Sequence, residues 1–566
     1  GLFFLIGLGM AFYRRYLVKP PKLTYGPRFT YTLIVLGIIV STGLLVEGLR
    51  LAVVRPAWGA WSVIGYALSA LFQATGANEG SLRTAHLGVW WIHSLTVALF
   101  IATLPQSFFW HLLGTGLNMF FTDFRPRGAL APIENIEEAE LLGVGNIAQF
   151  PWTRFIEFDS CTECGRCQDV CPAYAANQPL NPKQLILDLR DHMWASEGGL
   201  LTLAAQRAAA LGSNGNGADQ DADLLALSEV EGPPLIGDII RHDTVWACTT
   251  CQACVHECPV LIQHVDDVMD MRRYLTLMEG NLPETLAGTL QRIETSGNPW
   301  GMSRRDRTTW TQRLDFEVPL MAEKGEADVL FWVGCAGSYD PRNQKVSRAV
   351  VKIFHAAGVD FAILGEEENC SGDSARRSGN EYLFQMLAEA NVETLKQYRF
   401  NRIVTQCPHC FNTIKNEYPQ FGGEFGVVHH TEFIQELIAQ GKIKLKAGSG
   451  QEAISFHDPC YLGRYNNVYN APRELLSASG FHLVELPHSR DRSFCCGGGG
   501  ARVWMEDRSE TPVAHLRLQE IVDSTPGAVA VGCPFCMIML EDAAKVKGID
   551  ETLTIKDVAE LVAERL

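Results

Sequence analysis

Two cysteine runs with the same spacing constrain this chain more than any other feature. Each run has the form C-x2-C-x2-C-x3-C-P. The eight cysteines are Cys161, Cys164, Cys167 and Cys171, then Cys248, Cys251, Cys254 and Cys258. Three thiolates on one tight turn bind one [4Fe–4S] cluster, and the fourth cysteine reaches a second cluster. Structural zinc would use two separated pairs of ligands. Disulfide bonds do not require the same cysteine spacing to occur twice. The runs therefore predict two [4Fe–4S] cubane clusters.

Crossed ligation assigns each cysteine to one of the two clusters. The first set is Cys161, Cys164, Cys167 and Cys258, and the second set is Cys248, Cys251, Cys254 and Cys171. The spacing is that of two-cluster ferredoxins, so we expect an α-helical ferredoxin domain at residues 152–280. Helices are expected at 181–194 and 266–278. Residues 196–235 are expected to form an inserted mobile loop, since they include a Gly/Asp-rich stretch.

Length, charge and cysteine usage narrow the class of protein. A chain of 566 residues exceeds a single core and should hold several domains. Its 17 cysteines are clustered at ligand spacing, which points to metal binding in a reducing compartment. The net charge of −16 argues against a nucleic-acid partner. The sequence shows no catalytic triad and no pair of carboxylates placed for acid–base catalysis, so we do not expect a hydrolase.

The first 121 residues read as an all-α transmembrane domain. Uncharged apolar runs cover 1–13, 29–46 and 87–104, and the last two are long enough to span a bilayer core. Five cations and no acid lie in the loop between the first two runs: Arg14, Arg15, Lys19, Lys22 and Arg28. By the positive-inside rule this loop is cytoplasmic. We therefore expect a multi-pass protein of the cell membrane, with its iron–sulfur domains on the cytoplasmic side. Further helices are expected upstream of Gly1.

Histidines in the third apolar run suggest a cofactor, because ionisable residues in membrane helices are usually functional. His93 and His111 are 18 residues apart, which would place them on one face of one helix, about 27 Å apart along its axis. Such ligands suit two stacked b-type haems. The alternative is that both are interfacial. His86 is expected to be interfacial or to line a quinone site. Each haem would need a second histidine from outside this sequence.

The C-terminal part contains two repeats, at residues 326–450 and 451–566. A strand-like run leads into Cys335 and another into Cys460, and each repeat closes on Cys-Pro-x-Cys. The first repeat holds Cys335, Cys370, Cys407 and Cys410, and the second holds Cys460, Cys495, Cys496, Cys533 and Cys536. The interval from Cys370 to Cys407 is 37 residues, and Cys496 to Cys533 is the same. We expect α/β units with ligands at the carboxyl ends of strands.

This pattern resembles the cysteine-rich CCG domain of heterodisulfide reductases. The resemblance implies a non-cubane [4Fe–4S] cluster, and the catalytic role, at the five cysteines of the second repeat. In the first repeat Asn369 stands where the paired cysteine would be, so the four remaining cysteines either hold an ordinary [4Fe–4S] cluster or are purely structural. His409 is expected beside the cluster or facing solvent. His457 is expected either to donate to cluster sulfur or move protons, or simply to pack.

Larger resemblances join these parts. Residues 1–115, with Pro105 between the two histidines, resemble the haem-b membrane subunit of respiratory nitrate reductases, which implies a quinone site near one haem. The whole chain resembles membrane-bound electron-transfer-flavoprotein:menaquinone oxidoreductases. The segments that carry this likeness are 13–16, 20–23, 127–130, 373–377, 379–381 and 457–464. Residues 122–151 would be a linker and 281–325 a connector.

The resemblance implies a multidomain oxidoreductase that passes electrons from a reduced electron-transfer flavoprotein, through [4Fe–4S] clusters and haem b, to menaquinone. Two alternatives share the same motifs. One is a heterodisulfide or sulfur-compound reductase fed by quinol. The other is a non-catalytic electron-transfer subunit of a larger respiratory complex.

Overall fold

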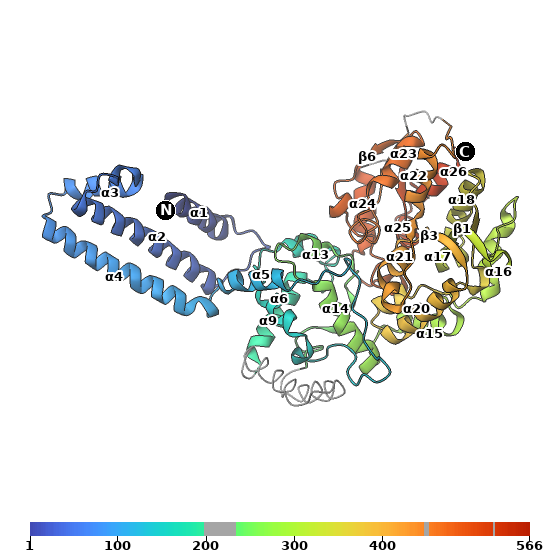
Figure 1. Ribbon diagram of the computed structural model, residues 1–566, viewed down its shortest axis with the longest axis horizontal. Coiled ribbons are helices and arrows are strands. Elements are labelled where there is room, and N and C mark those ends of the chain that lie inside the picture. Colours follow the sequence, from blue (N-terminus) through green and yellow to red (C-terminus); the bar gives the residue numbers. More distant parts are fainter. Residues whose placement is uncertain (197–233, 447–451, 525–526) are drawn as a thin grey trace. The chain divides into compact units, whose positions relative to one another are not determined.

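The computed structural model describes residues 1–196, 234–446, 452–524 and 527–566 (Figure 1). The chain forms two compact units. Unit 1 comprises Gly1–Thr122 and Ile156–Arg166, and unit 2 comprises Asp123–Phe155 and Cys167–Leu566. Nearly all of the loop predicted at 196–235 lies outside the described residues, so that expectation stays a prediction.

Unit 1 is built on two long apolar helices that pack side by side, α2 (Pro27–Val54) and α4 (Glu79–Thr103). Both are long and apolar enough to cross a membrane. Asn78 caps α4, its side chain accepting a hydrogen bond from the Ser81 N–H. The shorter helices are α1 (Leu2–Phe12), which continues as a π-helical turn at Tyr13–Val18, α3 (Val63–Ala74) and α5 (Trp110–Phe120). Helix α3 packs on α2 and was not expected from the sequence.

Large apolar side chains on α4 are exposed. Leu95 and Ile101 are each 63% exposed. A helix surface of this kind is costly in water but costs nothing against lipid tails. The exposed face of α4 therefore favours association of unit 1 with a membrane.

The expectation that one helix carries both His93 and His111 is wrong. Helix α4 ends at Thr103, a short 3-10 turn follows at Leu104–Gln106, and α5 begins only at Trp110. Pro105 has no N–H to continue the α-helical ladder, and Ser107 is extended. His93 thus lies on α4 and His111 on α5, so a spacing of five helical turns does not relate them.

The ferredoxin region consists of short helices around the cysteine runs. They are α6 (Trp152–Asp159), α7 (Arg166–Asp169), α8 (Pro172–Ala175), α9 (Pro182–Ala195), α12 (His242–Trp246), α13 (Ala253–Glu257) and α14 (His264–Arg273), which continues as a π-helical turn at Tyr274–Met278. Asn181 caps α9 by accepting bonds from two backbone N–H groups. Both helices predicted beside the runs are confirmed, as α9 and α14. Next come α15 (Glu284–Ser296), a 3-10 helix at Arg304–Arg313 and α16 (Met321–Lys324).

The two C-terminal repeats each contain a four-stranded parallel sheet. The first sheet has the order β2-β1-β3-β4, from β1 (Glu326–Trp332), β2 (Phe361–Ala362), β3 (Arg399–Thr405) and β4 (Val427–His429). The second has the order β6-β5-β7-β8, from β5 (Ala453–Phe456), β6 (His482–Val484), β7 (Ala528–Val531) and β8 (Thr554–Asp557). The matching strand orders confirm the predicted repeat and its α/β character.

Helices flank both sheets. In the first repeat they are α17 (Gly334–Tyr339), α18 (Asn343–Ala356), α19 (Asp373–Arg377), α20 (Glu381–Lys396), α21 (Pro408–Asn412) and α22 (His430–Ala439). In the second they are α23 (Asn470–Ala478), α24 (Val513–Ser524), α25 (Pro534–Val546) and α26 (Val558–Ala563). One hydrophobic core runs through both repeats and includes Phe331 and Phe354 from the first, and Phe456 and Val562 from the second. This shared core holds the cysteine-bearing ends of the two sheets in fixed positions.

Candidate metal centres

The cysteines predicted for the second ferredoxin cluster come together in unit 2. Burial is the main cause that raises the pKa of the Cys254 thiol well above its usual value, and Cys248, Cys251 and Cys171 lie close enough to act on its charge. Cys167, predicted for the first cluster, does so as well. The backbone N–H of Thr250 donates to Cys248 Sγ at 3.3 Å. Three of the four cysteines are buried and Cys254 is half-buried, and thiols in such a place become thiolates only beside a compensating cation. The set, called here the second ferredoxin site, therefore fits an iron–sulfur cluster.

The cysteines predicted for the first ferredoxin cluster divide between the two units. Cys161 and Cys164 belong to unit 1, whereas Cys167 and Cys258 belong to unit 2. The backbone N–H of Ile262 donates to Cys258 Sγ at 3.4 Å, a contact of the kind that stabilises ligand sulfur. The grouping of these four cysteines stays a prediction.

The five cysteines of the second repeat form one buried, connected group, the five-Cys site. Their side chains are neighbours in a series that runs from Cys460 to Cys495, Cys496, Cys536 and Cys533 in turn. Cys460 follows β5, and Cys533 follows β7. The carboxyl ends of adjacent parallel strands meet at one edge of a sheet, which explains how residues so distant in sequence converge.

His457 belongs to the five-Cys site. A nitrogen of its ring and the sulfurs of Cys496 and Cys536 all lie within 4.8 Å of one another. The Arg517 Nε–H donates to His457 Nδ1 at 3.0 Å. Burial, reinforced by Arg517, lowers the pKa of His457 to about 3, so the ring is neutral. Since Nδ1 accepts a bond, Nε2 carries the proton and is the nitrogen able to donate.

The four cysteines of the first repeat also converge, and form the four-Cys site. Cys335 is hydrogen-bonded to Cys370, and Cys407 to Cys410. Ser371 Oγ donates to Cys410 Sγ at 3.4 Å. The four residues line a small cavity of about 30 Å³. Four buried thiols on one cavity fit an iron–sulfur cluster as well as the second ferredoxin site does.

Arg307 and Glu368 hold the segment that carries Cys335 in place beside the four-Cys site. Neither residue was predicted from the sequence. Arg307 Nη2 lies 3.6 Å from Cys335 Sγ and donates to Glu368 Oε1 at 2.6 Å. Glu368 also accepts the backbone N–H groups of Val333 and Gly334, just before Cys335. Both side chains are almost fully buried. The only signal in the sequence is the position of Glu368 two residues before Cys370.

Asn369 occupies the position where the second repeat has the first cysteine of its pair. Its Oδ1 is buried and has no hydrogen-bond partner among the described residues. A Cβ added at Gly297 would lie 2.6 Å from this oxygen. The backbone of Gly297, at a φ of +69°, thus lies directly against the Asn369 side chain.

His409 lies between the two sites and does not face solvent, so that alternative is wrong. It is 5% exposed, and its Nδ1 lies 2.8 Å from Asp373 Oδ2. Its ring stacks on Tyr461 and is hydrogen-bonded to Cys533. Burial opposes the charge, but Asp373 and Cys533 outweigh it and raise the pKa of His409 to about 10. Burial alone would raise the pKa of the Cys533 thiol, but hydrogen bonds from Cys536 and His409 outweigh burial and lower this pKa to about 5.

The ferredoxin region touches the five-Cys site directly. The side chains of Cys251 and Cys495 lie close enough for each to act on the charge of the other. Tyr461 OH lies 2.9 Å from Thr250 Oγ1. A Cβ at Gly499 would lie 2.4 Å from the Thr249 carbonyl oxygen, so a side chain there would force the two segments apart. The glycine run after Cys496 thus permits close approach to the second ferredoxin site.

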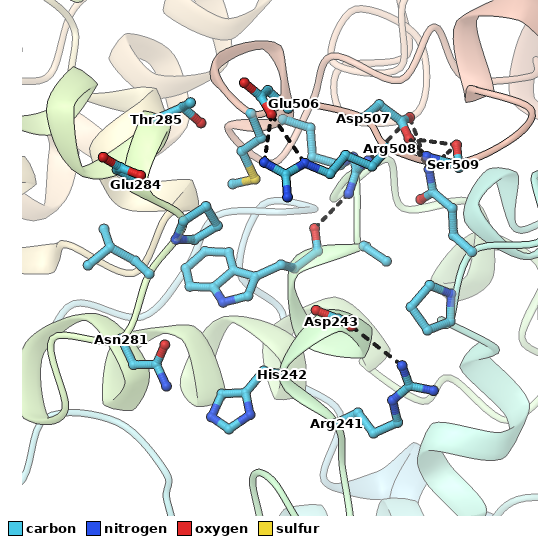
Figure 2. A pocket seen from close by; sticks show the side chains of 18 of the residues that line it. Arg241, His242, Asp243, Asn281, Glu284, Thr285, Glu506, Asp507, Arg508 and Ser509 are labelled. Atoms are coloured by element: carbon cyan, nitrogen blue, oxygen red, sulfur yellow. Dashed lines mark hydrogen bonds and ion pairs between the residues drawn. The ribbon is translucent and has the colours of Figure 1, made fainter.

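A large open pocket of about 930 Å³ lies beside this contact (Figure 2). Trp246, two residues before Cys248, lines it, and Arg502 donates to the Trp246 carbonyl at 3.0 Å. The rim carries side chains of both positive and negative charge, including the ion pair of Arg508 with Glu506. The pocket suits a polar, charged partner surface, and nothing in the sequence indicated it.

The three histidines of unit 1 differ in what their ring nitrogens contact. His93 Nδ1 lies 3.0 Å from Thr42 Oγ1, and His111 Nδ1 is bonded to the Phe108 carbonyl. His86 Nε2 is buried with no hydrogen-bond partner among the described residues. A histidine that ligates a metal commonly fixes its other nitrogen in this way. His93 and His111 each have one ring nitrogen held in this way, each on its own helix.

Comparisons with known proteins agree with these sites. A 4Fe-4S dicluster domain matches residues 160–262, and a cysteine-rich domain matches 329–415 and 454–541. The probable iron-sulfur-binding oxidoreductase FadF of Bacillus subtilis is 39% identical, over 99% of this chain and 81% of its own length. The EtfAB:quinone oxidoreductase of Syntrophomonas wolfei is 35% identical, over 99% and 80%. A probable membrane-anchored ferredoxin of Chromohalobacter salexigens is 43% identical, over 75% and 62%.

Proposed function

This chain belongs to the family of iron–sulfur oxidoreductases that includes FadF and EtfAB:quinone oxidoreductase, and we propose that it passes electrons from a reduced electron-transfer flavoprotein to menaquinone. The chain is an oxidoreductase that carries iron–sulfur clusters. The donor, the acceptor and the direction of transfer form the proposal.

One observation carries it: three cysteine sets of unit 2 touch in series. The second ferredoxin site meets the five-Cys site through Cys251 and Cys495. The five-Cys site meets the four-Cys site through Cys533 and His409. A hydrolase or a binding protein has no use for such a series, whereas a protein that relays electrons needs its carriers close together.

The clusters, when bound, supply one-electron carriers. The protein's side chains bury the sulfurs, exclude water and donate hydrogen bonds, which together set the reduction potentials. Ser371, Arg307 and the N–H of Gly497 are such donors, each directed at a cysteine sulfur. The five-Cys site, with His457 against two of its sulfurs, is the proposed catalytic site.

The membrane end of the proposal rests on unit 1. His93 and His111 would bind haem b, with further ligands from outside this sequence, and His86 would line the menaquinone site. The five cations at residues 14–28 favour a cytoplasmic position for the loop between α1 and α2. The iron–sulfur region would then lie on the cytoplasmic side, where a soluble flavoprotein reaches it.

The test is made on protein purified in detergent with its clusters. Reduced electron-transfer flavoprotein is added, and haem and quinone absorbance are followed. Reduction of haem and then formation of menaquinol is the expected result. If dithionite reduces the haem but the flavoprotein does not, the donor assignment is wrong, and quinol-driven disulfide reduction is the assay to run next. A His93→Ala variant should lose part of its haem absorbance, that of the haem held by His93, while keeping its iron–sulfur spectrum.

A further inference from the structure

In each Cys-Pro-x-Cys motif, the residue at the x position lies against the cysteines of the other repeat. His409 lies between Cys407 and Cys410 of the four-Cys site, yet its ring is hydrogen-bonded to Cys533 of the five-Cys site. Phe535 lies between Cys533 and Cys536, yet it lines the cavity of the four-Cys site. The rings of His409 and Phe535 are 4.7 Å apart. The repeats are thus reciprocal in geometry but not in chemistry, because histidine donates hydrogen bonds and phenylalanine does not.

The position of the His409 ring is fixed on several sides. Asp373, at the start of α19, binds Nδ1, and Arg377 holds Asp373 in turn at 3.3 Å. Tyr461 stacks on the ring with centroids 4.0 Å apart. All of these groups are buried. A side chain so constrained keeps one rotamer, so its contact with Cys533 is a permanent feature of the fold.

We propose that His409 is a positioning residue that joins the four-Cys and five-Cys sites into one electron pathway. Its backbone is continuous with two cysteines of one site, and its ring is hydrogen-bonded to a cysteine of the other. The route between the sites therefore consists of covalent bonds and a single hydrogen bond, without a gap. One electron leaves one site and arrives at the other, and no bond forms or breaks and no proton leaves the ring.

The same hydrogen bond should stabilise the reduced five-Cys site. A donor directed at a ligand sulfur offsets the negative charge that reduction adds, and hydrogen bonds to sulfur are among the factors that set cluster potentials. The four-Cys site receives only the apolar ring of Phe535 in exchange. His409 should therefore make the five-Cys site the better electron acceptor of the two. This inference rests on the proposed function, since it requires a cluster at both sites.

The test compares three variants of the full-length, cluster-loaded protein. His409→Phe keeps a ring but removes the donor, and His409→Gln restores a donor. Phe535→Leu is the matched control at the corresponding position of the other repeat. The readouts are iron content, the midpoint potential of each cluster signal by electron paramagnetic resonance, and the rate of electron equilibration between the two sites after photoreduction.

For His409→Phe we expect the reduction equilibrium of the five-Cys site to shift about tenfold toward the oxidised form, which is about 59 mV for one electron. Equilibration should also slow, while iron content stays the same. His409→Gln should recover most of the potential shift. Phe535→Leu, which packs against the same cysteines but removes no donor, should shift the five-Cys potential much less than His409→Phe does. A potential and a rate equal to wild type in His409→Phe would overturn the proposal. So would an equal effect of Phe535→Leu, which would indicate packing alone.

Two further results keep the test decisive. If His409→Phe loses iron, Asp373→Ala replaces it, because that change leaves His409 in place but removes the side chain that accepts its Nδ1–H. A wild-type potential in a fully loaded Asp373→Ala protein would then overturn the proposal. If the wild-type protein itself lacks a cluster signal at either site, the proposed function fails at that site, and this failure is distinct from any effect of His409.

Discussion

The side chains of Cys251 and Cys495 lie against each other, although one belongs to the ferredoxin region and the other to the second repeat. Two predicted ligand sets that are far apart in sequence thus share a contact. Tyr461 and Arg464 reinforce it, since Arg464 Nε donates to the Cys251 carbonyl at 2.7 Å. Whatever perturbs one site should be detected at the other.

Cys495→Ser is the direct test of this contact. We expect loss of the five-Cys signal together with a changed signal from the second ferredoxin site, because Cys251 loses its sulfur neighbour. Electron paramagnetic resonance of the purified protein measures both. Cys370→Ser, in the four-Cys site, is the matched control and should leave the ferredoxin signals as they are. Unchanged ferredoxin signals in Cys495→Ser would contradict the contact.

Arg307 should raise the potential of the four-Cys site. Its guanidinium contacts Cys335 Sγ and is 2% exposed, and a hydrogen bond from a charged group contributes about 1.5–3 kcal/mol. Arg307→Gln removes the cation and leaves the negative charge of Glu368 without its ion-pair partner. Both changes disfavour the addition of an electron to the four-Cys site. We expect a lower midpoint potential in a potentiometric titration. Arg304→Gln, an exposed position of the same 3-10 helix, serves as control and should show no shift.

Glu381 should stabilise the joint between the ferredoxin region and the first repeat. It binds Arg273 of α14 at 2.9 Å and Arg376 at 3.1 Å, and all three are buried. Removing one partner from a buried ion pair costs about 3–5 kcal/mol. Glu381→Gln should therefore lower the urea midpoint of unfolding. The exposed Glu389→Gln on the same helix should leave it unchanged.

The contribution of Glu381 should depend on pH. Burial opposes its ionisation, but Arg273 and Arg376 outweigh burial and lower its pKa below the usual value. A carboxyl whose folded pKa is depressed stabilises the fold fully above its unfolded pKa, about 4.3, and loses that contribution as the pH falls further. The difference in urea midpoint between wild type and Glu381→Gln should be largest near neutral pH and shrink in acid. A constant difference would contradict the assignment.

The pocket of Figure 2 should affect how a charged redox partner associates. Arg508 at its rim is 88% exposed and paired only with Glu506 among the described residues. Charges at a rim mainly alter association rates and their dependence on salt. Arg508→Glu should change the KM for reduced flavoprotein at low ionic strength and not in high salt, with kcat constant. Lys352→Glu, outside the pocket, is the control. Equal KM values at low salt would exclude this surface as the docking site.

Much of this molecule follows from local patterns in the sequence. Ligand spacing on a tight turn depends on a few neighbouring residues, which is why both ferredoxin runs and both Cys-Pro-x-Cys motifs are evident without a structure. Strand-like runs before Cys335 and Cys460 predicted the two α/β units, which the structure shows to be built on parallel sheets, and the 37-residue interval predicted their repetition. Each of these features is encoded within a short segment.

The tertiary structure determined which of the predicted ligand residues come into contact with one another. The break at Pro105 separates His93 from His111, because a missing N–H interrupts a helix that hydropathy alone reads as continuous. The shared core of the two repeats brings His409 onto Cys533, and packing of the glycine run brings Cys495 onto Cys251. Arg307 and Glu368 carry no motif and acquire a role only by burial beside Cys335. The sequence by itself therefore determined which residues are able to bind clusters, whereas the order in which the cluster sites touch depends on contacts between distant segments, which no local pattern encodes.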